Sequence, residues 1–168
     1  MIVVRGTKKF LDRVGRPDTS YESSTSLGDW YANALFWRPQ VALFVNAQTL
    51  FPVLVPLAPA TSVVSRLPTA FGDLARRLGA GQASLDRELA GMAEHVLAKT
   101  ASRSVLGVMN EFAHMAEHYY SERGTIDLVD VSMWLAQVPS SPLYGSHISP
   151  DRELLAASYP SISLANFE

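Results

Sequence analysis

The chain has 168 residues, a hydrophobic fraction of 48%, a charged fraction of 18% and a formal net charge of −2, a composition typical of a globular domain with a sizeable core. It contains no cysteine, which excludes disulfides, thiolate zinc sites and cysteine nucleophiles and fits a cytoplasmic setting. The longest apolar stretch, 41–57, contains polar residues and two prolines, so we expect no membrane span. No basic region precedes the short apolar run near the N-terminus, and no secretory signal is predicted.

The first segments predict a strand followed by a short helix. Residues 2–5 are mostly β-branched and favour a strand. Thr7 can cap a helix over 8–14, and Gly15 can end it. One side of this helix is apolar, and the other carries the cations Lys8, Lys9, Arg13 and Arg16.

The next apolar segments predict a hairpin. Residues 30–37 have apolar side chains at helical spacing, which favours a short helix, although their aromatic content also fits a strand. Residues 40–45 and 50–55 read as two buried strands joined by a turn at 46–49. Because Pro52 has no N–H to donate, the second strand should lie at a sheet edge or a bulge.

Beyond residue 60 the pattern changes to helical periodicity. We expect helices over 67–78, from Ser84 to about residue 99, over 104–121 and over 128–138, with one further helical turn around 151–157. The predicted class is α+β, with a small antiparallel sheet packed against a C-terminal group of about four helices. We treat 1–168 as a single domain with a strand-bearing part (1–60), a helical part (61–138) and an irregular tail (139–168).

A polar stripe on the helix over 104–121 is the first candidate site. Arg103 and Asn110 lie opposite the apolar face of this helix. The guanidinium of Arg103 could bind a carboxylate or phosphate near the helix N-terminus. Gly107 lowers helix stability by roughly 1 kcal/mol relative to Ala, which suggests close packing by a ligand or a backbone. The alternative is that Arg103 and Asn110 serve structure through internal hydrogen bonds.

A metal site on the same helix is a weaker interpretation. Glu111, His114 and His118 share one face at spacings known from di-iron and zinc sites. However, the second motif that either site needs is missing, so no metal is predicted. Phosphate-binding and dinucleotide-binding glycine motifs and a serine nucleophile elbow are also absent, and no cofactor is expected.

Four blocks of sequence carry a family resemblance, namely residues 2–9, 27–33, 43–50 and 103–110. In these blocks the chain resembles an uncharacterised bacterial family, a domain of unknown function. The resemblance implies a bacterial cytosolic protein and carries no activity. It points to a shared set of residues: Asp29, Trp30, Asn33, Asn46, Thr49, Arg103 and Asn110.

Charge is distributed unevenly along the chain. Residues 1–110 hold twelve Lys and Arg against eight Asp and Glu, whereas residues 111–168 hold two against eight. Such a separation of positive and negative charge can favour binding to a protein partner or to a second copy of the chain. A binding or regulatory domain that acts through a protein partner or a homo-oligomer is therefore the leading hypothesis.

The second hypothesis is an enzyme acting on nucleic acid or a nucleotide, which would be toxin-like and use Arg103 and Asn110. The acidic C-terminal third and the sequence pI near 6.1 argue against broad nucleic-acid binding. The candidate binding residues carried forward are Arg103, Asn110, Asp29, Asn33, Asn46 and Thr49.

Overall fold

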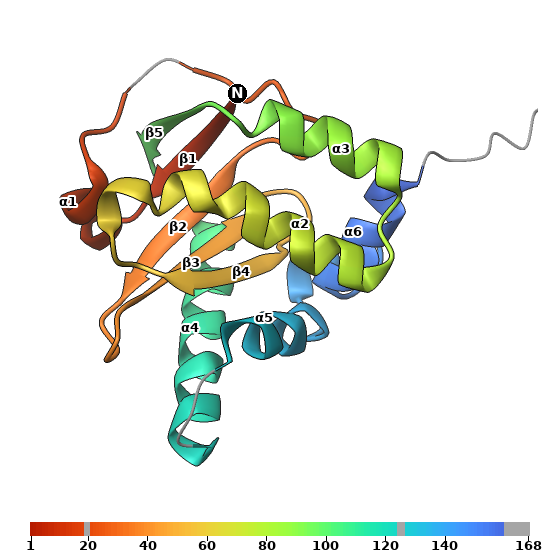
Figure 1. Cartoon of the computed structure of the whole chain (residues 1–168). Coiled ribbons are helices and arrows are strands. Elements are labelled where there is room, and N and C mark those ends of the chain that lie inside the picture. Colours follow the sequence, from red (N-terminus) through yellow and green to blue (C-terminus); the bar gives the residue numbers. More distant parts are fainter. Residues whose placement is uncertain (19–20, 124–126, 160–168) are drawn as a thin grey trace, which may run out of the picture.

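A computed structural model describes residues 1–18, 21–123 and 127–159 and shows a sheet between two helical layers (Figure 1). The strands are β1 (Ile2–Gly6), β2 (Trp30–Leu35), β3 (Val41–Asn46), β4 (Pro52–Pro56) and β5 (His95–Lys99). The helices are α1 (Lys8–Val14), α2 (Leu67–Leu78), α3 (Gln82–Gly91), α4 (Arg103–Arg123), α5 (Leu128–Ala136) and α6 (Pro150–Ser158). The last part of the predicted irregular tail, beyond residue 159, lies outside the described residues.

The sheet has the strand order β4-β3-β2-β1-β5. The pairs β2–β3 and β3–β4 are antiparallel, whereas β1 pairs in parallel with both β2 and β5. The α+β class is therefore confirmed, with a mixed sheet in place of the antiparallel one expected. The parallel pairs arise because α1 carries the chain from β1 to β2, and α2 and α3 carry it from β4 to β5.

Two sequence predictions of helix are wrong at β2 and β5. Residues 30–35 form a central strand because both faces of the sheet are covered there, so apolar side chains occupy successive positions and mimic a helical spacing. The helix that begins at residue 82 ends at Gly91, and 95–99 form an edge strand paired with β1. Neither long-range pairing is visible in local periodicity.

Helix α1 matches its prediction closely. The backbone N–H of Phe10 donates to the Thr7 hydroxyl at the N-terminus, and Gly15 follows the last turn with a φ of 147°. A Cβ on Gly6 would lie 2.8 Å from the Phe10 ring and 2.9 Å from the Leu11 side chain. Glycine at the end of β1 therefore lets α1 pack directly against the strand.

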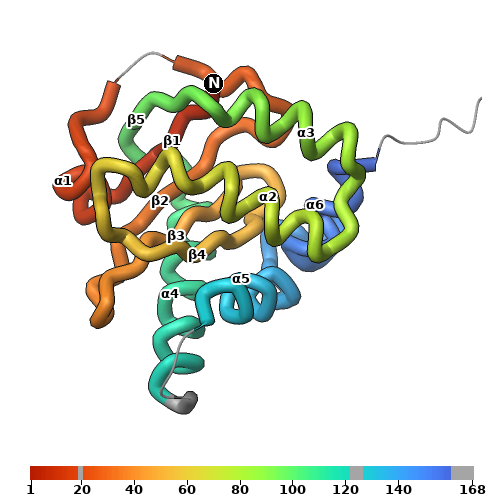
Figure 2. Tube along the Cα trace, viewed as in Figure 1, coloured from red at the N-terminus to blue at the C-terminus, as the bar shows by residue number. Residues whose placement is uncertain are grey.

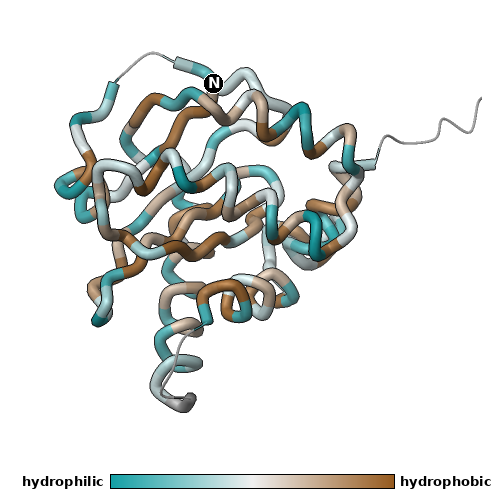
Figure 3. The backbone as a smooth tube through the Cα atoms, in the orientation of Figure 1, coloured by the Kyte–Doolittle hydropathy of each residue, from teal (hydrophilic) through white to brown (hydrophobic). Residues whose placement is uncertain are grey.

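Each face of the sheet carries its own apolar cluster. On one face Val4, Trp30 and Phe44 pack against α1, α2 and α3 through side chains such as Phe10 and Phe71. On the other face, α4 and α5 cover the sheet and contribute a second group, which includes Tyr31, Leu43, Val45, Met109, Phe112 and Leu135. Figure 3 shows hydrophobic residues along the strands, between the helical layers.

The outer edge of β4 has few hydrogen-bond donors to offer. The N–H of Leu54 donates to the Ser132 hydroxyl of α5 at 3.0 Å, so this residue has its N–H turned away from β3. The direction of the backbone N–H alternates along a strand, so positions 52 and 56, like Leu54, face away from β3. Both positions hold proline, which has no N–H. The prediction of an edge strand around Pro52 is confirmed.

The longest helix, α4, extends beyond the sheet (Figure 2). Its first half covers β2 and β3, and its last half runs past the sheet alongside the start of α5. None of the helices in the described ranges is long and apolar enough to cross a membrane.

Candidate functional site

The topology of the sheet singles out the carboxyl ends of β1 and β5. These neighbouring strands are parallel, and the helices that follow them leave to opposite faces, α1 to one side and α4 to the other. In open sheets with parallel strands, such a point of divergence leaves a crevice outside the carboxyl ends, where ligands commonly bind. The chain has a cavity at this position.

This cavity, hereafter the β1/β5 cleft, has a volume of about 710 Å³, within the range of small-molecule sites. Its walls come from the end of β1, from both ends of α1 and from the end of β5. The lining residues are Gly6, Lys8, Leu11, Asp12, Gly15, Arg16, Pro17, Lys99 and Thr100.

A second, smaller cavity adjoins the cleft. Its volume is about 240 Å³, and it shares Pro17, Lys99 and Thr100 with the larger one. Side chains of β1 and β5 on the α4 side of the sheet form its floor, which is apolar apart from Arg5. Pro17 lines both spaces, and the N–H of the next residue, Asp18, anchors this segment by donating to the carbonyl of Leu97 at 2.7 Å.

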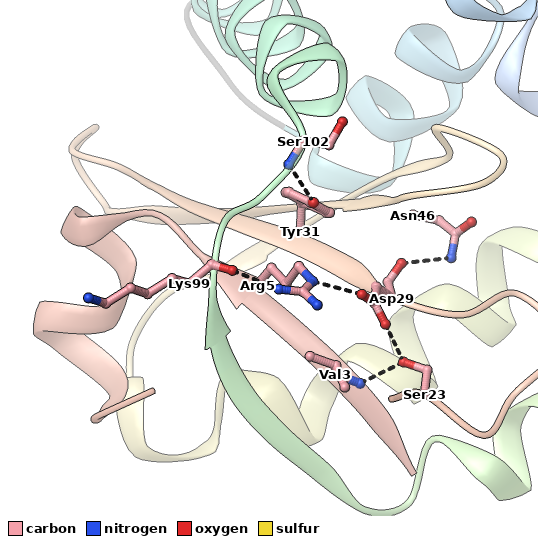
Figure 4. A network of polar contacts seen from close by, with 8 residues as sticks. All are labelled: Val3, Arg5, Ser23, Asp29, Tyr31, Asn46, Lys99 and Ser102. Carbon is pink, nitrogen blue, oxygen red and sulfur yellow. Dashed lines mark hydrogen bonds and ion pairs between the residues drawn. The ribbon is translucent and has the colours of Figure 1, made fainter. Parts of the chain in front are cut away.

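Arg5 is held in place beside this second cavity. Its Nε donates to Oδ2 of Asp29 at 2.7 Å, and its Nη1 donates to the carbonyl of Lys99 at 3.0 Å. The other Asp29 oxygen accepts from the Ser23 hydroxyl, which in turn accepts the N–H of Val3 (Figure 4). Nη2 of Arg5 makes no hydrogen bond within the described ranges, so this part of the guanidinium can serve a ligand.

The charges of the β1/β5 cleft favour an anion. Lys8 is paired with Asp12, at 2.9 Å from Nζ to Oδ2. Arg16 and Lys99 have no carboxylate partner among residues 1–18, 21–123 and 127–159. Two unpaired cations, with the hydroxyl of Thr100 beside them, can bind a carboxylate or phosphate.

Burial raises the pKa of Glu88 and lowers the pKa of His95. Neither side chain lines the two cavities.

The structure places Asn46 and Thr49 inside the β3–β4 turn. Asn46 is fully buried, and its Oδ1 accepts hydrogen bonds from the N–H of Gln48, the N–H of Thr49 and the Thr49 hydroxyl. Its Nδ2 donates to the carbonyls of Leu27 and Asp29 at 3.0 and 3.4 Å. All these contacts are internal to the fold.

Asp29 immediately precedes β2, and Asn33 lies within this strand. Asp29 reaches the cavities through Arg5, as described above. Oδ1 of Asn33 accepts from the Thr7 hydroxyl at 2.7 Å and from the N–H of Ala34 at 2.9 Å. Asn33 therefore links β2 to the residue that caps α1.

Arg103 and Asn110 are exposed on α4. No hydrogen bond or ion pair within the described ranges joins either side chain to the other four candidates, and neither lines the β1/β5 cleft or its neighbour. Among the described residues, nothing outside the helix's own backbone lies within 4 Å of the Cβ position of Gly107, so none of them packs there. Glu111, His114 and His118 are also exposed, and no metal-binding group of three such residues occurs among the described residues.

Sequence reasoning missed the part of the cleft that β5 contributes. Lys8 and Arg16 were recognised as a basic helix face, but 95–99 were assigned to a helix, which hid Lys99 and Thr100. The short run 95–99 followed by Ser102 as a helix cap was the available signal. The hydroxyl of Ser102 accepts the N–H of Val105 at the start of α4.

Comparison with known proteins places the chain in a family. The model of a family described as a domain of unknown function (DUF6933) matches residues 3–153. The chain belongs to the DUF6933 family. The match confirms the resemblance seen in the sequence and runs from β1 to the first turn of α6, so it includes the described cavities. No curated protein and no solved structure matches the chain.

Proposed function

We propose that the chain binds a small phosphate-bearing molecule in the β1/β5 cleft. The observation that carries the proposal is a cavity at the divergence of two parallel strands, lined by Arg16 and Lys99, two cations with no carboxylate partner in the described part of the chain. Phosphate is favoured over a single carboxylate because two cations from different segments line the same space, and a phosphate group carries nearly two negative charges where a carboxylate carries one.

Arg5 supports the same proposal from the neighbouring cavity. Its Asp29 partner fixes the guanidinium plane, so the unused Nη2 is already oriented before a ligand arrives. A side chain held in this way loses little conformational entropy when it binds, which raises affinity. A ligand longer than a phosphate could reach from the cleft past Pro17 toward Arg5.

Isothermal titration with inorganic phosphate, AMP and ATP tests the proposal. We expect binding by the wild-type protein and at least a tenfold weaker Kd for Lys99→Glu, because one charge-assisted hydrogen bond contributes about 1.5–3 kcal/mol. Arg77→Glu is the matched control, since Arg77 is exposed near the far end of α2 and lines neither cavity. Equal affinity of Lys99→Glu and wild type, or no binding of any of the three probes, would refute the proposal.

A protein partner or self-association is the second candidate function. Support comes from the loop before α6, where Tyr144 and Ile148 are 61% and 42% exposed. Ile148 also has a φ of 76°, which is strained for a β-branched residue. Light scattering of the wild type and of Tyr144→Ser at several concentrations tests it, and a monomer at every concentration counts against self-association. A bacterial, cytosolic setting stays a prediction of the sequence.

A further inference from the structure

The cations around the β1/β5 cleft continue across the neighbouring surface. Helix α1 turns a basic side outward, with Lys9 and Arg13 one helical turn apart, or about 6 Å along the axis. The loop between β2 and β3 adds Arg38, which is exposed. We call this surface the basic edge, and it consists of Lys8, Lys9, Arg13, Arg16, Phe36, Arg38 and Lys99.

Two contacts place the β2–β3 loop beside α1. Nη1 of Arg13 donates to Oε1 of Gln40 at 2.6 Å. Nζ of Lys9 lies 5.6 Å from the centre of the Phe36 ring. These two contacts join α1 to the β2–β3 loop, and both segments lie at the same side of the molecule (Figure 1).

Positive charge predominates among the residues of the basic edge. It holds six cations, and the carboxylates that line the two cavities with Lys8, Arg16 and Lys99 are Asp12, which is paired with Lys8, and Asp18. The whole chain has a net charge of −2. The positive electrostatic potential at the basic edge therefore comes from the local arrangement of cations and not from the net charge of the protein. A group of cations on an otherwise acidic protein attracts a chain of phosphates to one place.

Phe36 adds a feature that a simple anion does not need. Its side chain is 54% exposed, although aromatic rings of this size are usually buried. Bases of single-stranded nucleic acid stack on exposed aromatic rings next to cations that hold the backbone. In a duplex the bases are already stacked on each other, so an isolated ring favours a single strand.

We propose that the basic edge binds single-stranded nucleic acid. A terminal phosphate enters the β1/β5 cleft, the backbone follows Lys9 and Arg13, and a base stacks on Phe36 near Arg38. This inference rests on the proposed phosphate site and extends it by naming a polynucleotide as the ligand.

Fluorescence anisotropy with a labelled, 5′-phosphorylated oligonucleotide of eight to ten nucleotides, as RNA and as DNA, tests the inference. We expect tighter binding than for AMP, and affinity that falls as salt rises. Phe36→Leu keeps an apolar side chain but removes the ring face, and it should weaken oligonucleotide binding about tenfold. Arg38→Glu should also weaken oligonucleotide binding, while both variants bind AMP as the wild type does.

The outcomes separate this inference from the proposed function. If AMP binds and the oligonucleotide binds no more tightly, the polynucleotide inference fails and the phosphate site stands. If Arg38→Glu and Phe36→Leu bind the oligonucleotide like the Arg77→Glu control, or if poly-glutamate of equal length binds as tightly, the inference is also wrong. If inorganic phosphate, AMP, ATP and the oligonucleotide all fail to bind, both proposals fail. Circular dichroism of each variant checks that the fold is intact.

Discussion

Replacing Asn46 by alanine tests whether this residue serves the fold. The side chain is fully buried and makes five hydrogen bonds, three as acceptor and two as donor. In Asn46→Ala the N–H groups of Gln48 and Thr49 and the carbonyl of Leu27 lose the partner that Asn46 provides. A buried polar group without a partner costs about 1–3 kcal/mol.

The expected loss of unfolding free energy is about 3 kcal/mol, at the low end for three groups because the turn can relax and admit water. For a domain of this size that corresponds to a fall in Tm of about 6–12 °C. Urea denaturation followed by circular dichroism measures the free energy, and differential scanning calorimetry measures Tm. The urea m-value should stay unchanged, since the native fold is the same.

Asn110→Ala is the matched control, because Asn110 is an exposed asparagine on α4 that the sequence predicted, like Asn46, to be a binding residue. Its stability should change by no more than about 0.5 kcal/mol, since exposed substitutions are mild and alanine favours helix. The reasoning is refuted if Asn46→Ala retains wild-type stability, and in particular if it then loses phosphate binding, which would make Asn46 a ligand-binding residue.

Two further predictions concern Gly107 and Glu88. Gly107→Ala should raise the free energy of unfolding by up to about 1 kcal/mol, because a Cβ at this exposed helix position meets open space. Gly6→Ala should lower the free energy of unfolding, since a Cβ at that position meets Phe10 and Leu11. If urea denaturation shows that Gly107→Ala is less stable than the wild type, something packs against Gly107 and the reasoning is wrong. Burial raises the pKa of Glu88 above its ordinary value of 4.5, with partial compensation from Thr25 and the N–H of Leu27. The folded state therefore holds this proton more tightly than the unfolded state, and the associated stability is lost as the pH rises through the folded pKa. Glu88→Gln removes this loss, so the unfolding free energy of the variant relative to wild type should increase from about pH 4 to about pH 7, and a flat difference would contradict the reasoning.

Segments whose structure depends on residues close by in the sequence could be predicted from the sequence. Thr7 and Gly15 delimit α1, Asp127 caps α5 with its carboxylate, and Gly79 ends α2 in a left-handed conformation. The turn at 46–49 also formed where expected, because asparagine organises such turns through its own side chain. In each case the signal lies within a few residues.

The strands β2 and β5 depended on distant partners. Trp30 at the start of β2 pairs with Val4, and the five residues of β5 pair with β1 across more than ninety positions of sequence. The candidate cleft arises from that second pairing, so its cations Arg16 and Lys99 come from segments with no shared local pattern. Asn46, in contrast, has a side chain whose type suits both a ligand site and a turn, and only its burial and contacts distinguish the two.

The proline-bounded edge of β4 has a consequence for how the protein behaves at high concentration. Sheet proteins polymerise when an uncovered strand offers regular donors to another chain. If α5 detaches in a brief opening of the fold, the outward register of β4 presents the N–H of Leu54 between two prolines. A lone donor cannot start a ladder, so this end of the sheet should stay inert toward fibril growth even in partly opened molecules.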